Sequence, residues 1–206
     1  MPATVTLEPP GAGLRWHVRL AAKFLIRRYV RKTDASQATA FFRREGDRIL
    51  ALARGLTPEQ LAERVLVPPL RGLEDSSRYW SVAMVMEHLE IVNKLVCDLV
   101  VALSNGQVPP GQVQIADVKP HATVDATAAI ASFEALLARY EATVATRAVP
   151  MNATARYAHP WFGPIDAHTW LCFGPLHQRI HRKQIEAIIA GLGQPGPQVI
   201  ETPRRV

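Results

Sequence analysis

Apolar residues recur every three or four positions along most of the chain, which is the period of an α-helix. Asp34 and Asp166 precede two such stretches as capping residues, Pro58 can open a short helix, and Gly106 can end a long one. Sustained alternation, the pattern of a strand, is missing, so residues 113–115 are at most a tiny strand. We predict helices over 34–55, 57–66, 75–104, 125–147 and 166–191.

Four of these predicted helices are long, which indicates an all-α protein built as a four-helix bundle. The link at 105–124 is too long for a simple antiparallel hairpin and contains proline and glycine, so we predict a crossover connection. The bundle is expected to occupy residues 33–206, and residues 1–32 form a basic N-terminal extension.

Positive charge is concentrated in that extension. The net charge is +6, yet beyond residue 32 the basic and acidic side chains balance. A uniformly basic surface, which would favour a nucleic-acid partner, is therefore not expected for the bundle. The basic residues between 11 and 32 are Arg15, Arg19, Lys23, Arg27, Arg28, Arg31 and Lys32, with no acidic residue among them.

The same stretch forms an amphipathic helix. Trp16, Leu20 and Phe24, with Ile26 or Val30, lie towards one broad face. Three interpretations compete: an added helix that packs on the bundle with its cations solvated, an interfacial helix on anionic lipid, and a nucleic-acid contact. A mitochondrial presequence has a similar composition.

Composition indicates a soluble globular protein, because 48% of residues are hydrophobic, 20% are charged and the mean hydropathy is +0.01. Cys97 and Cys172 lie in apolar stretches, where two buried thiols in a reducing compartment are favoured over a disulfide. We see neither a secretory signal nor a charge-free stretch long enough to span a membrane, so we expect a cytoplasmic protein.

Three histidines lie on apolar helix faces. His177 and His181 are four residues apart and share one face of the last predicted helix, opposite its charged side chains. His88 lies with Val92 and Leu99 on the apolar face of the second long helix. Three imidazoles that point into one interior are costly unless each has a partner, and a divalent metal would serve all three. Three core histidines bonded to the backbone or to Asp98 are the alternative.

The remaining histidines carry less information, and we expect each on the surface or in a loop. They are His17, His121, His159 and His168.

Two segments resemble the DinB/YfiT-like superfamily. Residues 78–81 (RYWS) leading into 87–89 (EHL) resemble its second helix. Residues 159–165 (HPWFGPI), with the later tryptophan and HxxxHxxQ spacing, resemble the HPxFG signature of a bacterial branch. The resemblance covers residues 35–192 and implies a four-helix bundle with one divalent ion, zinc, nickel, iron or manganese, on His88, His177 and His181. Ile180 stands where members of that branch often have a further histidine.

The family includes enzymes that use low-molecular-weight thiols, and three protein ligands leave a coordination position open. The resemblance therefore implies metal-assisted activation of a thiol or water against a small electrophile, as in an S-transferase or hydrolase. Glu87 points sideways from His88, so we expect a structural role for it and assign no catalytic residue. Pocket or supporting residues are expected at Gln184, Trp161, Phe162, Trp170 and Met84.

Two other functions remain open: a metal-binding or stress-associated module without catalysis, and an interaction protein that acts at a membrane through its basic helix. The expected partner is a small-molecule substrate, and no specific nucleic acid is expected. Weak membrane-surface contact through residues 11–32 and a homodimer are further alternatives.

Overall fold

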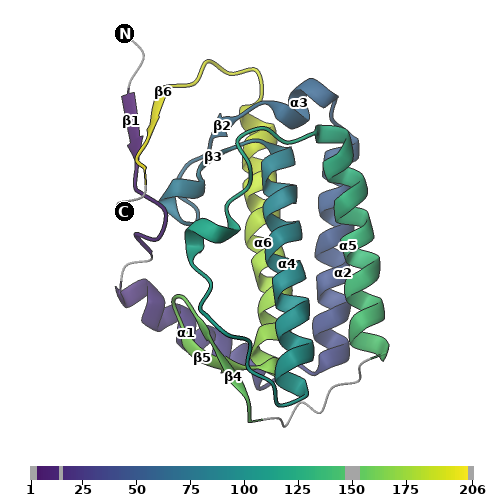
Figure 1. Cartoon of the computed structure of the whole chain (residues 1–206). Helices are drawn as coiled ribbons and strands as arrows, with labels where there is room; N and C mark the ends of the chain where they lie inside the picture. Colours follow the sequence, from purple (N-terminus) through teal and green to yellow (C-terminus); the bar gives the residue numbers. More distant parts are fainter. Residues whose placement is uncertain (1–3, 14–15, 147–153, 204–206) are drawn as a thin grey trace.

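Four long helices pack side by side in the computed structural model, which describes residues 4–13, 16–146 and 154–203 (Figure 1). Helix α6 packs against α2 and α4, and α5 packs against the other sides of α4 and α2. This arrangement confirms the predicted four-helix bundle. The helices are α2 (Ala35–Arg54), α4 (Val82–Ser104), α5 (Ala126–Thr146) and α6 (Ala167–Gly191).

Side-chain caps set where these helices begin. The carboxylate of Asp34 accepts a hydrogen bond from the backbone N–H of Gln37, and Asp166 accepts one from Thr169. Each satisfies a backbone donor that has no partner within its helix. The predicted starts of α2 and α6 therefore match the structure closely.

The connection between α4 and α5 runs along the bundle from one end to the other, so both helices begin at the same end (Figure 1). It contains a 3₁₀ turn, η2 (Ile115–Val118), where we had predicted at most a strand at 113–115. Residues 113–115 form no strand, which is within the limit we had set, and the predicted crossover is present.

Two helix boundaries were also predicted wrongly. The short helix α3 (Pro58–Ala62) ends before residue 66, because strand β2 (Val65–Leu66) pairs antiparallel with β3 (Tyr79–Trp80). For the same reason α4 does not start at residue 75. A 3₁₀ turn, η1 (Asp75–Ser77), and β3 come first, and the Ser81 hydroxyl then caps α4 by accepting from Met84 N–H.

Two further strand pairs flank the bundle. Strands β4 (Arg156–His159) and β5 (Gly163–Asp166) form an antiparallel hairpin, and β1 (Thr4–Leu7) pairs in parallel with β6 (Gln198–Glu201). Leu7 on β1 is buried. Strands of two to four residues are too short to show an alternation, which is why the sequence pattern did not reveal them.

A proline lies inside α6 just before the first of its two inward histidines. Pro175 has no N–H to offer the carbonyl of Leu171, and the Tyr140 hydroxyl from α5 donates to that oxygen instead, at 3.4 Å. Gly174 provides the room, since a Cβ there would lie 3.3 Å from the hydroxyl. Tyr140 also stacks on Phe42 of α2, so this contact joins three helices of the core.

Helix α1 (Trp16–Val30) lies beside the β4–β5 hairpin at one end of the bundle (Figure 1). The face we had expected to be continuous is divided: Ile26 and Val30 are half-buried, whereas Trp16, Leu20 and Phe24 are exposed.

Within the described residues, none of the helices is both long enough and apolar enough to cross a membrane. Cys97 and Cys172 are both buried thiols.

Candidate metal centre

The three inward histidines meet between α4 and α6. The Nε2 atom of His177 lies 3.3 Å from Nε2 of His88 and 3.1 Å from Nε2 of His181. One nitrogen from each ring lies within 4.8 Å of the others. His88 and His181 are buried and His177 is half-buried. Helical spacing on two neighbouring helices therefore gathers three imidazole nitrogens at one point.

Hydrogen bonds on the far side of two rings fix their proton positions. Nδ1 of His88 donates to the carbonyl of Val118 at 2.6 Å, because a carbonyl can only accept. Nδ1 of His181 donates to Oε1 of Gln184 at 2.7 Å, and the Gln184 amide donates to the carbonyl of Ser77 at 2.7 Å. Both Nε2 atoms therefore carry no proton, and their lone pairs face His177.

This donor set suits a divalent cation. Lone pairs held close together repel one another unless a proton or cation lies between them, and outer hydrogen bonds of this kind orient metal-binding histidines. The rings are also kept neutral, as ligands must be. Burial lowers the pKa of His88 and His177 well below 6.5 and that of His181 to about 4.

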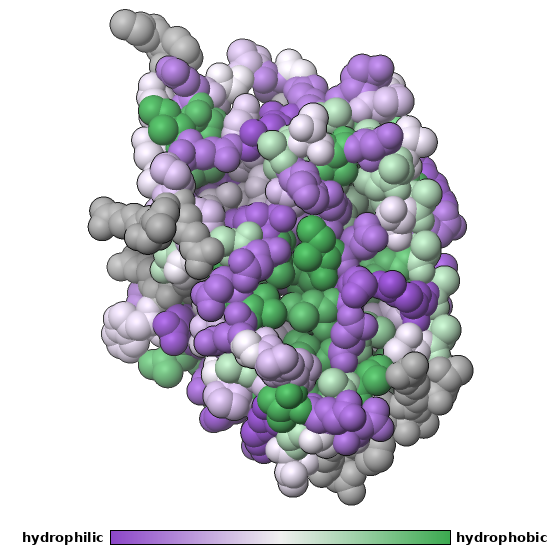
Figure 2. All heavy atoms as spheres, viewed as in Figure 1, coloured by the Kyte–Doolittle hydropathy of each residue, from purple (hydrophilic) through white to green (hydrophobic). Residues whose placement is uncertain are grey.

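A cavity of about 100 Å³ opens onto the three histidines. Figure 2 shows apolar residues gathered in the middle of the face that α4 and the crossover connection form. Trp161 and Trp170, both expected at the site, line the cavity. Phe162 and Met84 do not: Phe162 packs against the ring of His159 in a tilted arrangement, and Met84 is buried in the core. The other apolar side chains of the lining are Leu73, Val92, Leu95, Val113, Ile115, Val118, Pro160 and Phe173.

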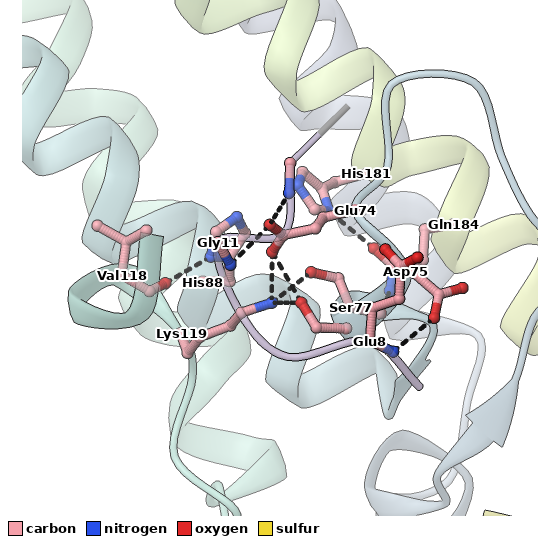
Figure 3. Close-up of polar contacts among 12 residues, drawn as sticks. Glu8, Gly11, Glu74, Asp75, Ser77, His88, Val118, Lys119, His181 and Gln184 are labelled. Atoms are coloured by element: carbon pink, nitrogen blue, oxygen red, sulfur yellow. Dashed lines mark hydrogen bonds and ion pairs between the residues drawn. The ribbon is translucent and has the colours of Figure 1, made fainter. Parts of the chain in front are cut away.

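A buried ion pair anchors the segment that holds His88 (Figure 3). The Lys119 ammonium lies 3.2 Å from the Glu74 carboxylate and donates to the hydroxyls of Ser76 and Ser77. Lys119 directly follows Val118, whose carbonyl accepts from His88. Burial lowers the pKa of Lys119, and Glu74 opposes that shift. This pair could not be predicted from local sequence patterns, because its members are 45 residues apart.

The N-terminal segment completes this network. Backbone N–H groups of Gly11 and Gly13 donate to Glu74, and the N–H of Glu8 donates to Asp75 (Figure 3). Gly11 adopts a positive φ of 88°, which a residue without a side chain adopts readily. Gly11 and Gly13 are thereby tied to the same carboxylate that holds Lys119, and Glu8 is tied to the neighbouring Asp75.

One histidine was placed wrongly from the sequence. His159 is buried on β4 and lines the cavity, although we had expected it on the surface or in a loop. Its Nδ1 accepts from Trp161 N–H at 3.1 Å, and burial lowers its pKa to about 4. The aromatic HPWF run at 159–162 is the sequence feature from which the burial of His159 could have been predicted. By contrast, His121 is exposed and pairs with Glu87.

The fold is thus a four-helix bundle with a crossover connection. Three converging histidines give it a candidate metal centre. The family model of the DinB superfamily matches residues 41–185, and the chain belongs to that superfamily. Among solved structures, the chain is similar to "TT2238, a four-helix bundle protein", at 20% identity over 75% of this chain and 98% of that one, with a TM-score of 0.49. No curated protein matches.

Proposed function

We propose that His88, His177 and His181 bind one divalent metal ion and that the protein uses it to activate a low-molecular-weight thiol or water against a small electrophile. The observation that carries the proposal is the convergence of three Nε2 atoms at the end of a cavity, with two outer nitrogens already hydrogen-bonded. Superfamily members often bind a divalent metal.

A divalent ion at this position would polarise a carbonyl or lower the pKa of a water or thiol. The protein's own residues orient the histidines and set where their protons lie. Val118 and Gln184 hold the protons of His88 and His181 on Nδ1, which leaves Nε2 available. Three protein ligands leave room for a further one, as in catalytic rather than structural sites.

The cavity supports a mostly apolar substrate. Most of the side chains that line it are apolar, and Trp161, Trp170 and Phe173 form an aromatic wall. Such a wall limits the access of bulk water to a reactive group. The Glu74 carboxylate is the charged acceptor at the edge, and it is engaged by Lys119 and Gly11.

These contacts of Glu74 favour one alternative function, a metal-binding module without catalysis. A carboxylate that already accepts from Lys119, Ser76 and Gly11 is poorly placed to remove a proton from a substrate.

The test combines metal loading with turnover. Untagged protein is stripped with a chelator, reloaded with zinc, nickel, iron(II) or manganese(II), and assayed with glutathione, cysteine or water against small electrophiles such as epoxides and activated esters. We expect turnover that requires metal and is lost in His177→Ala, whereas His121→Ala behaves as the wild type. Stoichiometric metal without turnover across the panel would favour the module, and no metal binding would refute both.

A further inference from the structure

We propose that the outward face of α1 binds the surface of an anionic phospholipid membrane. Trp16, Leu20 and Phe24 would enter the boundary between headgroups and acyl chains, and the surrounding cations would contact lipid phosphates. The proposal concerns a surface remote from the histidines and does not depend on metal binding.

The apolar side chains of this face are exposed far beyond what packing on the bundle requires. Trp16 is 73%, Leu20 59% and Phe24 63% exposed. Spaced four residues apart, they form one stripe along the helix. Leu25, on another side of the helix, is also 61% exposed, and α1 contains no buried residue. A contiguous apolar stripe that faces solvent marks an interaction surface.

The opposite face of α1 attaches the helix to the protein. Tyr29 packs edge-to-face against Phe41 of α2, and His168 of α6 contacts the carbonyl of Val30. Ala22 and Ile26 on this side are half-buried. The helix therefore already has its contact with the bundle, and the stripe is the face left over.

Charge identifies the occupant of that face. No acidic residue occurs between positions 9 and 33. Cations flank the stripe on both sides, which is the composition of helices that lie in the interface of anionic membranes. The basic residues of α1 and the following turn are Arg19, Lys23, Arg27, Arg28, Arg31 and Lys32.

Other occupants fit less well. A second copy would bring two faces of the same charge together, which repel one another. A nucleic acid would place its phosphates against the stripe of Trp16, Leu20 and Phe24, and it would not bury the aliphatic side chain of Leu20. An anionic lipid surface satisfies both the cations and the apolar stripe.

The test is co-sedimentation of the full-length protein with vesicles of phosphatidylcholine alone or mixed with phosphatidylserine. The apolar variant carries Leu20→Ser and Phe24→Ser, and its control carries Val108→Ser and Ile200→Ser, which are exposed apolar residues elsewhere. The charge variant carries Lys23→Gln, Arg27→Gln and Arg28→Gln. Its control carries Arg71→Gln, Arg179→Gln and Lys183→Gln, three exposed cations outside α1. Circular dichroism verifies that each variant is folded.

We expect binding to the phosphatidylserine vesicles that weakens with salt and falls by about tenfold or more in either α1 variant, with both controls unchanged. Equal sedimentation of all variants would overturn the proposal, as would the absence of binding to either kind of vesicle. Tighter binding to a single-stranded oligonucleotide than to vesicles, or self-association that the apolar variant abolishes, would assign the face to another partner and likewise overturn it.

Discussion

The histidine cluster and α1 both set polar nitrogen groups among aromatic and aliphatic side chains, yet the protein buries one and exposes the other. His88, His177 and His181 lie between α4 and α6. On α1, Trp16 and its neighbours face outward. Similar helical patterns thus have opposite outcomes.

The protonation chemistry of the two groups explains the difference. An imidazole can lose its proton, and burial lowers its pKa so that the neutral ring enters the interior at moderate cost. A guanidinium stays charged at any ordinary pH and must keep water or an anion. The neutral nitrogens of the cluster therefore suit a cation, and the permanent positive charges of α1 suit an anionic surface.

Loss of a histidine should have the largest effect. Replacing His88, His177 or His181 with alanine removes a ligand, and we expect metal affinity to fall by at least about a hundredfold, since loss of an outer partner alone costs about 10- to 100-fold. Calorimetric titration of stripped protein with zinc measures this, with His168→Ala as the control. Unchanged affinity in His88→Ala would refute the three-ligand site and the contrast with α1.

Acid should act on the cluster and leave α1 unaffected. In the metal-free protein the folded pKa of His181 is about 4, below the unfolded value near 6.5. Neutral histidine thus stabilises the fold fully above pH 6.5, and this stability is lost as the pH falls towards 4, by up to about 3 kcal/mol for His181.

Urea unfolding at several pH values checks this. Metal-loaded protein should release its ion at still lower pH, because the bound ion further favours the neutral rings, and more than one proton should be taken up per ion released. A free energy of unfolding that is constant from pH 7 to pH 4.5 would contradict the buried neutral rings.

The Glu74–Lys119 pair should have a smaller effect on metal affinity. Lys119→Met frees the segment that holds Val118 against His88, and we expect an affinity loss of about tenfold together with a changed absorption spectrum of the cobalt(II)-loaded protein. Glu74 keeps its hydrogen bonds from Gly11 and Ser76 but loses its cation, and this buried uncompensated charge also destabilises the fold, by about 3 kcal/mol.

Adding Glu74→Gln to Lys119→Met should recover stability without recovering the cobalt spectrum. The matched control is Lys94→Met, which removes an exposed ion pair with Asp98. If the double variant regains the wild-type spectrum, Lys119 does not position His88.

Deletion of residues 1–32 should have the smallest effect on the site. All four long helices lie beyond residue 32, so we expect a folded bundle that still binds metal. The deletion removes buried Leu7 and the bonds from Gly11 to Glu74, and we expect a melting temperature lower by several degrees. Circular dichroism and metal titration measure both. Unfolding, or loss of metal, would make these residues part of the core.

Much of this architecture could be predicted because it depends on helical periodicity. The caps at Asp34 and Asp166 and the inward faces of α4 and α6 follow from local sequence. The strands β2 and β3 could not be predicted, because two residues show no period and the pairing joins separate segments. His159 was missed because a strand of four residues, rather than a helix, carries it into the interior.

The candidate site could also be predicted only in part. His177 and His181 are neighbours by spacing, and His88 reaches them because α4 and α6 pack together. Lys119, Glu74 and the Val118 carbonyl meet only through the fold. The outward direction of the α1 stripe could not be predicted either, since an amphipathic pattern does not say which face the bundle covers.

Elemental analysis of untagged protein, purified without added metal, tests the central claim most directly. We predict one equivalent of a divalent transition metal per chain in the wild type and in His121→Ala, and almost none in His177→Ala. Equal metal content in His177→Ala and the wild type, or no metal in the wild type even after incubation with zinc, nickel, iron(II) and manganese(II), would contradict the three-histidine centre.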